Sequence, residues 1–294
     1  MTMQDCIPGR MRAWRGGVAL LGLMLCAMPS LAAEVALFET WRDTGNYRVF
    51  NNGVGVSSTG GDGTIENVNI TGPVAKAYLY WIGANIPAAD VSTDDTVYFG
   101  VEGMPGTDVM ADNSYVIPFE RPFAPGAFFW NANHSAFVAD VTQLIQPGMN
   151  NYSITEFDMD IEFGVGLQVV YEDDSAPLSE IAIHQGHDFA FLGWNNAEEL
   201  NRTDVVTHTF APTDFDRVLQ VTFFSGGGED TDRPDQLWSL TGIHDDPGDL
   251  PDELITNNLG NVIDTNPLEA DNGEEWDTVV KEVLIPAGET FASF

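Results

Sequence analysis

Acidic side chains at short spacing are the residues of this sequence best suited to chemistry. They fall in two loop-like stretches, and the candidates are Glu229, Asp230, Asp232, Asp235, Asp245, Asp246 and Asp249. Calcium binds six to eight oxygens, which carboxylates and loop carbonyls supply together. The spacing is not that of an EF-hand, because the glycine and the terminal glutamate are misplaced. The pattern predicts a Ca²⁺ site, against the alternative of acidic loops that are merely solvated.

A second acidic pattern alternates with apolar residues along 156–163. Glu156, Asp158, Asp160 and Glu162 are separated by single apolar residues, which predicts a strand with one buried and one wet face. Carboxylates two apart on a strand face lie about 7 Å from each other and repel. We interpret this face as a solvated surface screened by salt, with a cation-binding surface as the alternative.

Histidines and tryptophans give weaker candidates. His184, His187 and Asp188 have a spacing that would bind zinc on a helix, but strand-like flanks and Gly186 favour ordinary histidines at a strand end. Trp194, Trp238 and Trp276 are candidates for stacking on sugar rings, although buried tryptophans are common in β-sandwiches. Trp194 and Trp238 are the predicted ligand-binding positions.

Nucleophile motifs are missing from the sequence. There is no G-x-S-x-G motif, and the two cysteines, Cys6 and Cys26, both precede residue 33. Carboxylate pairs for glycoside chemistry are so numerous that no pair stands out. The sequence therefore favours a protein that is not an enzyme, with a polysaccharide lyase or glycosidase that uses loop carboxylates as the alternative.

Short apolar strands separated by Gly, Pro and Asp dominate the elements that must position these residues. Strands are predicted at 34–41, 74–82, 95–101, 114–119, 137–140, 156–163, 167–171, 178–183, 203–211, 217–224, 236–240 and 276–285. The glycine-rich stretch 51–63 is predicted to be a loop, and Asp140 to cap a short helical turn that carries Leu144 and Ile145 into the core. No stretch keeps a helical period for three turns. We predict an antiparallel β-sandwich of jelly-roll type whose interior includes Leu79, Trp81, Val169, Tyr171, Val221 and Phe223.

Two stretches of the chain carry a family resemblance. Ala139-Asp140-Val141-Thr142 with Pro147-Gly148 and Asn150 resembles a corner of galactose-binding-like jelly rolls in secreted glycosidases. Together with 167–173 and Pro177-Leu178, it more closely resembles uncharacterised β-sandwich domains of large bacterial and archaeal surface proteins. The resemblance implies a β-sandwich in a cell-surface context and implies no chemistry.

The N-terminus has the pattern of a secretory signal peptide. Three arginines precede an apolar run, and Ser30-Leu31-Ala32 fits a cleavage site, so we expect residues 1–32 to be removed. The mature chain then has no cysteine and no disulfide. Residues 33–294 are predicted to form one large domain, with an internal boundary near 146–150 as the alternative. No later segment is apolar enough to span a membrane.

The charge is strongly negative. The chain has 11 Lys and Arg against 45 Asp and Glu, a net charge of −34. Removal of 1–32 takes away three basic residues and one acidic residue and leaves −36. Such a field repels nucleic acids and anionic lipids. It indicates a high-salt (halophilic) habitat, cations bound between carboxylates, or both.

These patterns together predict a secreted, calcium-stabilised protein of the cell surface or matrix, with the periplasm as the alternative location. Its role is expected to be binding, adhesion or structure, with carbohydrate or another surface protein as partner. A third alternative, beside the enzyme, is a filament subunit that donates the strand 34–41 to the open sheet edge of a neighbour.

Overall fold

The computed structural model describes residues 34–86, 95–120, 131–188, 190, 202–228, 235–243, 260–273 and 275–294. Its contacts divide the chain into two compact units, Met1–Leu31 and Ala32–Phe294, and every described residue belongs to the second. Strands make up 66% of the structure and helix 1%, and the sheets are antiparallel. The predicted all-β class is therefore confirmed, and the jelly-roll connectivity stays a prediction.

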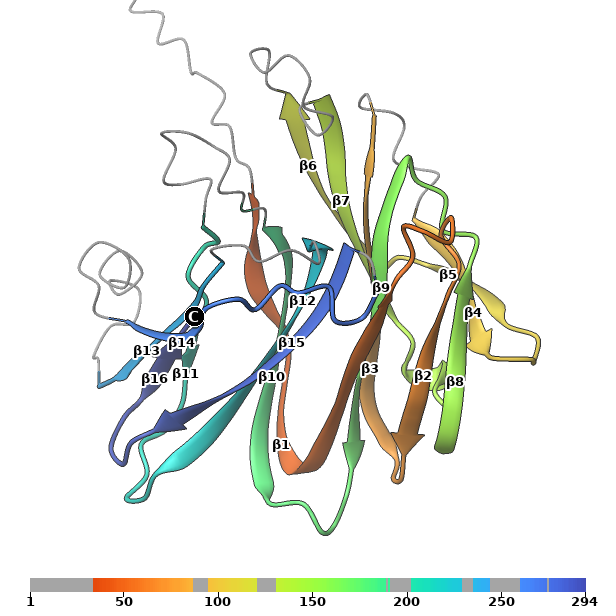
Figure 1. Ribbon diagram of the computed structural model, residues 1–294. Coiled ribbons are helices and arrows are strands. Elements are labelled where there is room, and N and C mark those ends of the chain that lie inside the picture. The colour runs from red at the N-terminus through yellow and green to blue at the C-terminus, as the bar shows by residue number, and fades with distance from the viewer. Residues whose placement is uncertain are drawn as a thin grey trace, which may run out of the picture. The chain divides into compact units, whose positions relative to one another are not determined.

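Sixteen strands and one 3-10 turn are described (Figure 1). They are β1 (Glu34–Gly55), β2 (Gly63–Ile70), β3 (Val74–Asn85), β4 (Thr96–Val101), β5 (Thr107–Met110), β6 (Asn113–Glu120), β7 (Asn131–Asp140), η3 (Thr142–Leu144), β8 (Gly148–Thr155), β9 (Ile161–Glu172), β10 (Leu178–Asp188), β11 (Thr207–Thr209), β12 (Arg217–Gly228), β13 (Leu237–Gly242), β14 (Asn261–Asp264), β15 (Glu275–Ile285) and β16 (Phe291–Ser293). The sheet orders are β10-β1-β9-β3-β7-β6, β2-β8-β4-β5, β12-β15 and β11-β16-β13-β14.

Strand β1 joins two parts of the six-stranded sheet. Its first half pairs with β10, from Glu34 opposite Asp188 to Asn46 opposite Leu178. Its second half pairs with β9, ending with Gly55 opposite Gly164. The strand therefore continues through residues 51–55, where the glycines of the sequence predicted a loop. That prediction was wrong for 51–55, where the Trp276 indole lies against Gly53, whereas residues 56–62 form the predicted loop.

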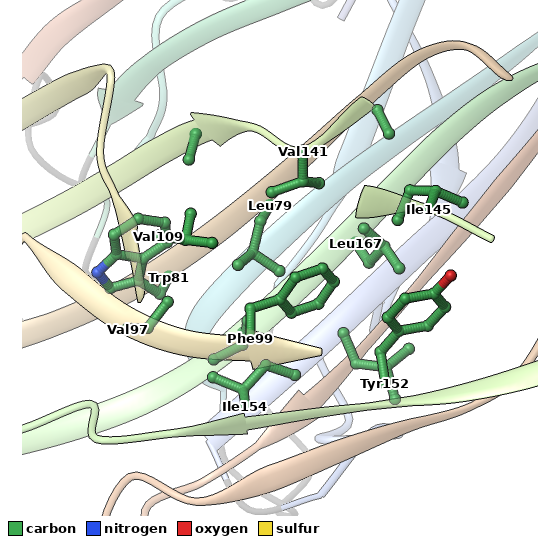
Figure 2. Close-up of a cluster of buried hydrophobic side chains, with 14 of the residues drawn as sticks. Leu79, Trp81, Val97, Phe99, Val109, Val141, Ile145, Tyr152, Ile154 and Leu167 are labelled. Carbon is green, nitrogen blue, oxygen red and sulfur yellow. The ribbon is translucent and has the colours of Figure 1, made fainter. Parts of the chain in front are cut away.

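The six-stranded sheet packs on β2-β8-β4-β5 over a dry apolar core. Leu79 and Trp81 of β3 meet Phe99 of β4 and Tyr152 of β8, and the Phe99 and Tyr152 rings stack at 5.2 Å (Figure 2). Period-two alternation places these side chains on the facing sides of the two sheets. We call this interior the sandwich core. Leu79, Trp81, Val169 and Tyr171 lie in it as predicted, whereas Val221 and Phe223 are only half-buried elsewhere.

The opposite face of the six-stranded sheet encloses a second core. Its buried members include Tyr115 of β6 and Ile183 of β10, which are the two edge strands of the sheet. Strands β1 and β10 lie against β6, and β10 also lies against β7, although no described ladder of hydrogen bonds joins these pairs. The sheet therefore curls until its edges approach. We call the enclosed cluster the curl core: Tyr78, Tyr115, Ala136, Val138, Val170 and Ile183.

The strand pair β12-β15 covers another part of this second face. The Trp276 side chain is fully buried against glycines of β1 and β9. A Cβ atom on Gly53 would lie 2.1 Å from Trp276 Nε1, and one on Gly164 would lie 2.5 Å from Trp276 Cε3. Only glycine leaves room for the indole at these two positions. On its other face, β15 packs Val283 and Ile285 against β16 and its neighbours.

The corner after β7 forms as the sequence predicts. β7 ends at Asp140, whose Oδ1 accepts the Thr142 N–H at 2.9 Å and the Thr142 hydroxyl at 2.5 Å. The turn η3 follows, and Ile145 enters the sandwich core with Leu144 packed against it. The Tyr152 hydroxyl then accepts the Gln146 N–H at 2.6 Å. This corner joins two strands of the same compact unit.

Candidate functional site

Asp235 is the one carboxylate of the predicted calcium loops that lies among the described residues. Glu229, Asp230, Asp232, Asp245, Asp246 and Asp249 lie outside them. Asp235 comes just before β13. Its Oδ2 atom is buried and has no hydrogen-bond partner among the described residues. Burial of an unpaired carboxylate oxygen is costly, and a cation or a water bound at this atom would offset that cost.

The end of β12, the last described part of the chain before residue 229, lies beside the start of β9. The final glycines of β12 lie against Phe163 of β9, and a Cβ atom on Gly226 would be 2.9 Å from Phe163 Cβ. Phe163 directly follows Glu162. The end of β12 therefore lies close to the end of the acidic segment 156–162.

The strand predicted at 156–163 begins only at Ile161, so the prediction was wrong for 156–160. Glu156 has a φ of 65°, which interrupts an extended strand. Phe157 and Met159 are buried and hold the segment to the sandwich core. The N–H of Asp160 donates to Asn85 Oδ1 at 3.2 Å, and Asp160 Oδ2 accepts the Ile86 N–H at 2.6 Å. The segment is a linker fixed by hydrogen bonds rather than a charged strand face.

Glu162 is the carboxyl of this segment with the most perturbed environment. Burial raises its pKa, and the negative charges of Asp158 and Asp160 raise it further. A bound cation would lower this pKa again, because it stabilises the charged carboxylate. Even so, no three His, Cys, Asp or Glu side chains within the described ranges are gathered closely enough to hold a metal ion.

The histidine pattern at 184–188 does not form a zinc site. β10 is a strand there, and alternation sends His184 and His187 to opposite faces. His184 pairs in register with Glu39, whose carboxylate binds Arg42 on the outer side. His187 points into the curled sheet and is 8% exposed. The interpretation as ordinary strand histidines is the one that the geometry supports.

Trp194 lies outside the described residues, and Trp238 is half-buried on β13. Trp276 is fully buried. Of these three tryptophans, Trp238 is the one in the described part of the chain whose side chain is partly exposed and so accessible to a ligand. It pairs in register with Val262 of β14.

A shallow depression of about 420 Å³ lies where the end of β1 meets β2 and β8. It is lined by Val54, Gly55, Thr59, Asp62, Gly63, Thr64, Ser153, Ile154 and Thr155. Asp62 is the single carboxylate of this lining, and four of the other eight residues carry hydroxyl groups. A paired-carboxylate mechanism needs two acids across a cleft. This depression is suited to weak polar contacts and does not provide that pair.

A cluster of buried polar side chains is the feature that sequence reasoning missed. It consists of Tyr115, His134, Gln185 and His187, and each is at most 8% exposed. We call it the inner polar cluster. Tyr115 Oη, Gln185 Nε2 and His187 Nε2 have no hydrogen-bond partner among the described residues. The spacing of Gln185 and His187 in a strand places both on one face, but only the curl of the sheet brings them to Tyr115 and His134.

Both histidines of the inner polar cluster are held neutral by burial. Burial lowers the pKa of His134 to about 4. Burial, with a smaller contribution from the nearby His134, lowers the pKa of His187 to about 3. The His134 ring stacks on Phe163 with centroids 6.2 Å apart. These imidazoles are uncharged near neutral pH.

The described residues contain no helix long and apolar enough to cross a membrane. No protein-family model, no curated protein and no solved structure matches this chain.

Proposed function

We propose that this chain is a secreted, acidic β-sandwich protein of the cell surface or matrix, with a binding or structural role and a fold stabilised by Ca²⁺. The observation that carries the proposal is the buried Oδ2 of Asp235, which has no hydrogen-bond partner among the described residues. Asp235 ends a stretch of sequence rich in carboxylates, and carboxylate and carbonyl oxygens are the ligands Ca²⁺ prefers. The sequence puts Asp230 and Asp232 within five residues of it.

Electrostatics favour a bound cation. The chain carries a net charge of −34, and like charges on a folded protein repel each other. Bulk salt weakens this repulsion by shortening the screening length to about 8 Å at physiological strength. An ion bound only by the folded state adds to this, by about 2.7 kcal/mol at a hundredfold excess over Kd.

The described carboxylates support a structural role over a catalytic one. Asp173 bonds Ser175 and Arg48, and Asp140 bonds Thr142 and Lys76. Asp277 Oδ1 accepts the N–H groups of Glu269 and Asp271. Each of these groups fixes a turn, an ion pair or a loop. The half-buried Trp238 and the hydroxyl-lined depression suit a carbohydrate or a surface protein as partner.

The N-terminal strand bears on the alternative of a filament subunit. Residues 34–46 pair with β10 of the same chain, so donation to a neighbour would require this ladder to open first. The binding or structural role of a self-contained domain needs no such step, and we prefer it for that reason.

The calcium part of the proposal is tested by thermal melting of the chain 33–294. Tm is measured in EGTA, in 1 mM CaCl₂, and in NaCl of equal ionic strength. We expect CaCl₂ to raise Tm above matched NaCl by several degrees, since about 1 kcal/mol shifts Tm by about 2–4 °C at this size. Asp235→Asn should remove most of that rise.

Asp108→Asn is the matched control. Asp108 is exposed on β5, and its substitution removes the same charge as Asp235→Asn. It should leave the calcium response unchanged. Equal melting curves in CaCl₂ and matched NaCl would show that the acidity is only an adaptation to salt. An equal loss of response in Asp108→Asn would assign the effect to net charge.

A further inference from the structure

We propose that Asp277 and the loop that covers it form a binding site for one monovalent metal cation, Na⁺ or K⁺, held at Asp277 Oδ2. The loop is the connection from β14 to β15, of which residues 265–273 are described. We call it the β14–β15 loop. The site goes beyond the proposed calcium site, because it uses another carboxylate on another strand.

Asp277 is a carboxylate inside the protein. It lies on β15 and is 1% exposed. Its Oδ1 atom accepts the Glu269 N–H at 3.2 Å and the Asp271 N–H at 3.0 Å. The carboxylate therefore points into the β14–β15 loop, and hydrogen bonds of this kind favour its charged form.

The second oxygen of this carboxylate has been left without a donor. Asp277 Oδ2 is buried and has no hydrogen-bond partner among the described residues. A buried charge is costly unless it is paired. Burial raises the pKa of Asp277, and the negative charge of Asp271 raises it further. A cation at Oδ2 would stabilise the charged form and lower this pKa.

Basic side chains of the described chain do not occupy this position. Lys281 lies on the same face of β15 by strand alternation, but its Nζ pairs with Asp264. In the parts of the chain that the structure describes, no ion pair joins Asp277 to a lysine, arginine or histidine. A positive charge beside Asp277 Oδ2 would therefore come from solution.

The surroundings of Asp277 favour a cation with one charge. Glu269 and Asp271 are exposed, so Asp277 is the buried negative charge of this place. The described ranges contain no group of three His, Cys, Asp or Glu side chains that could hold a metal ion. One buried carboxylate neutralises one positive charge, whereas a divalent ion would leave an excess charge in the interior. Backbone carbonyl oxygens and water would complete the coordination, as carbonyls do for K⁺ in channels.

The β14–β15 loop is also fixed at a point other than Asp277. The Gly55 N–H donates to the Asn272 carbonyl at 2.8 Å, and Asn272 Nδ2 donates to Asn52 Oδ1 at 2.9 Å. The Thr278 N–H donates to Asn272 Oδ1 at 2.8 Å. Asp277→Asn keeps the Oδ1 acceptor and replaces only Oδ2, so we expect this variant to fold with the loop in place.

Thermal melting in different monovalent salts tests the proposal on the chain 33–294. Tm is measured in NaCl, KCl and tetramethylammonium chloride, with EGTA in all three. The salts are used at about 1 M, where each gives a screening length of about 3 Å. Tetramethylammonium is too bulky for a buried site. We expect NaCl or KCl to raise Tm by at least about 2 °C above tetramethylammonium chloride, and Asp277→Asn to remove that difference.

Two controls separate this site from other effects of salt. Asp108→Asn removes one exposed carboxylate and should keep the difference in Tm. Asp235→Asn alters the proposed calcium site and should also keep it, so either proposal can fail without the other. Equal Tm values in the three salts for the wild type would overturn the monovalent site. A difference that persists in Asp277→Asn would overturn it as well.

Hydrogen exchange on the unchanged chain decides the matter if Asp277→Asn does not fold. Peptides covering 266–273 are followed by mass spectrometry in the same three salts. At a tenfold excess of the bound ion over Kd, we expect their exchange to be about tenfold slower than in tetramethylammonium chloride. Peptides of β4 and β8 should exchange equally in all three. Equal exchange of 266–273 in the three salts, or the same change throughout the chain, would contradict a local site.

Discussion

The two faces of the six-stranded sheet solve the problem of burial differently. In the sandwich core the hydroxyl of the fully buried Tyr152 accepts a backbone N–H. The curl core includes Tyr115 and lies beside Gln185 and His187, and Tyr115 Oη, Gln185 Nε2 and His187 Nε2 have no hydrogen-bond partner among the described residues. The sandwich core is also covered by a second hydrogen-bonded sheet, whereas the curl is closed by side chains between two free edges.

This difference indicates that the two faces of the sheet contribute differently to stability and to motion. Buried polar groups with partners rigidify a core, and those without partners carry an energetic cost that makes the region easier to open. We infer that the sandwich core supplies most of the stability and that the curl is the part able to move. Substitutions on each face test that inference.

The largest effect is expected at Trp81 in the sandwich core. Trp81 is fully buried and stacks on Phe137 at 5.6 Å. Trp81→Ala should lower the free energy of unfolding by about 3–5 kcal/mol, because it removes apolar contact and leaves a cavity. Urea denaturation measures the loss. Leu178→Ala, at a side chain that is 72% exposed, should cost less than about 0.5 kcal/mol, and a comparable cost at both sites would contradict the comparison.

A smaller loss is expected at the glycine that accommodates Trp276. In Gly164→Ala the new Cβ atom would meet the indole at 2.5 Å and the Val54 carbonyl oxygen at 2.7 Å. We expect a cost of about 1–3 kcal/mol from overpacking. In a Trp276→Ala background the same substitution should cost clearly less, and this double-mutant cycle would find no coupling if the indole were not the obstacle.

The smallest effect is expected from two matched tyrosines. Tyr115→Phe removes a hydroxyl without a described partner, so stability should be unchanged or rise by up to about 1 kcal/mol. Tyr152→Phe removes the acceptor of the Gln146 N–H and should lower stability by about 1–3 kcal/mol. Chemical denaturation of both variants gives the comparison. A loss at Tyr115 as large as the loss at Tyr152 would mean that the Tyr115 hydroxyl is hydrogen-bonded as well as the Tyr152 hydroxyl is.

Local patterns were enough to predict many of the strands and much of the sandwich core, although β2, β5 and β14 were missed. Alternation along β3 and β9 placed Leu79, Trp81, Val169 and Tyr171 inside, and Asp140 marked the corner after β7. These features depend on residues near each other in the chain.

The curl and the course of β1 were beyond such patterns. His134 meets His187 only because distant strands approach, and no periodicity encodes that contact. Gly53 was predicted to lie in a loop, but it is a strand residue whose missing side chain leaves room for Trp276, which is distant in the sequence. Glu156 to Asp160 has perfect alternation, yet the hydrogen bonds of Asp160 to Asn85 and Ile86 hold it outside the sheet. In each case tertiary contacts overrode the local signal.

The pairing of β1 has a consequence for the order of assembly. The Thr40 hydroxyl donates a hydrogen bond to the Ile183 carbonyl, which lies 143 residues later in the chain. The second half of β1 pairs with β9, which also comes much later in the sequence. Contacts of such long range slow folding, because the loop between the partners must close first. On the proposed export route, the strand that emerges first would have no lasting partner until residues 161–188 had followed it. The time during which β1 stays exposed, rather than the stability of the finished sheet, would then limit how efficiently the protein assembles.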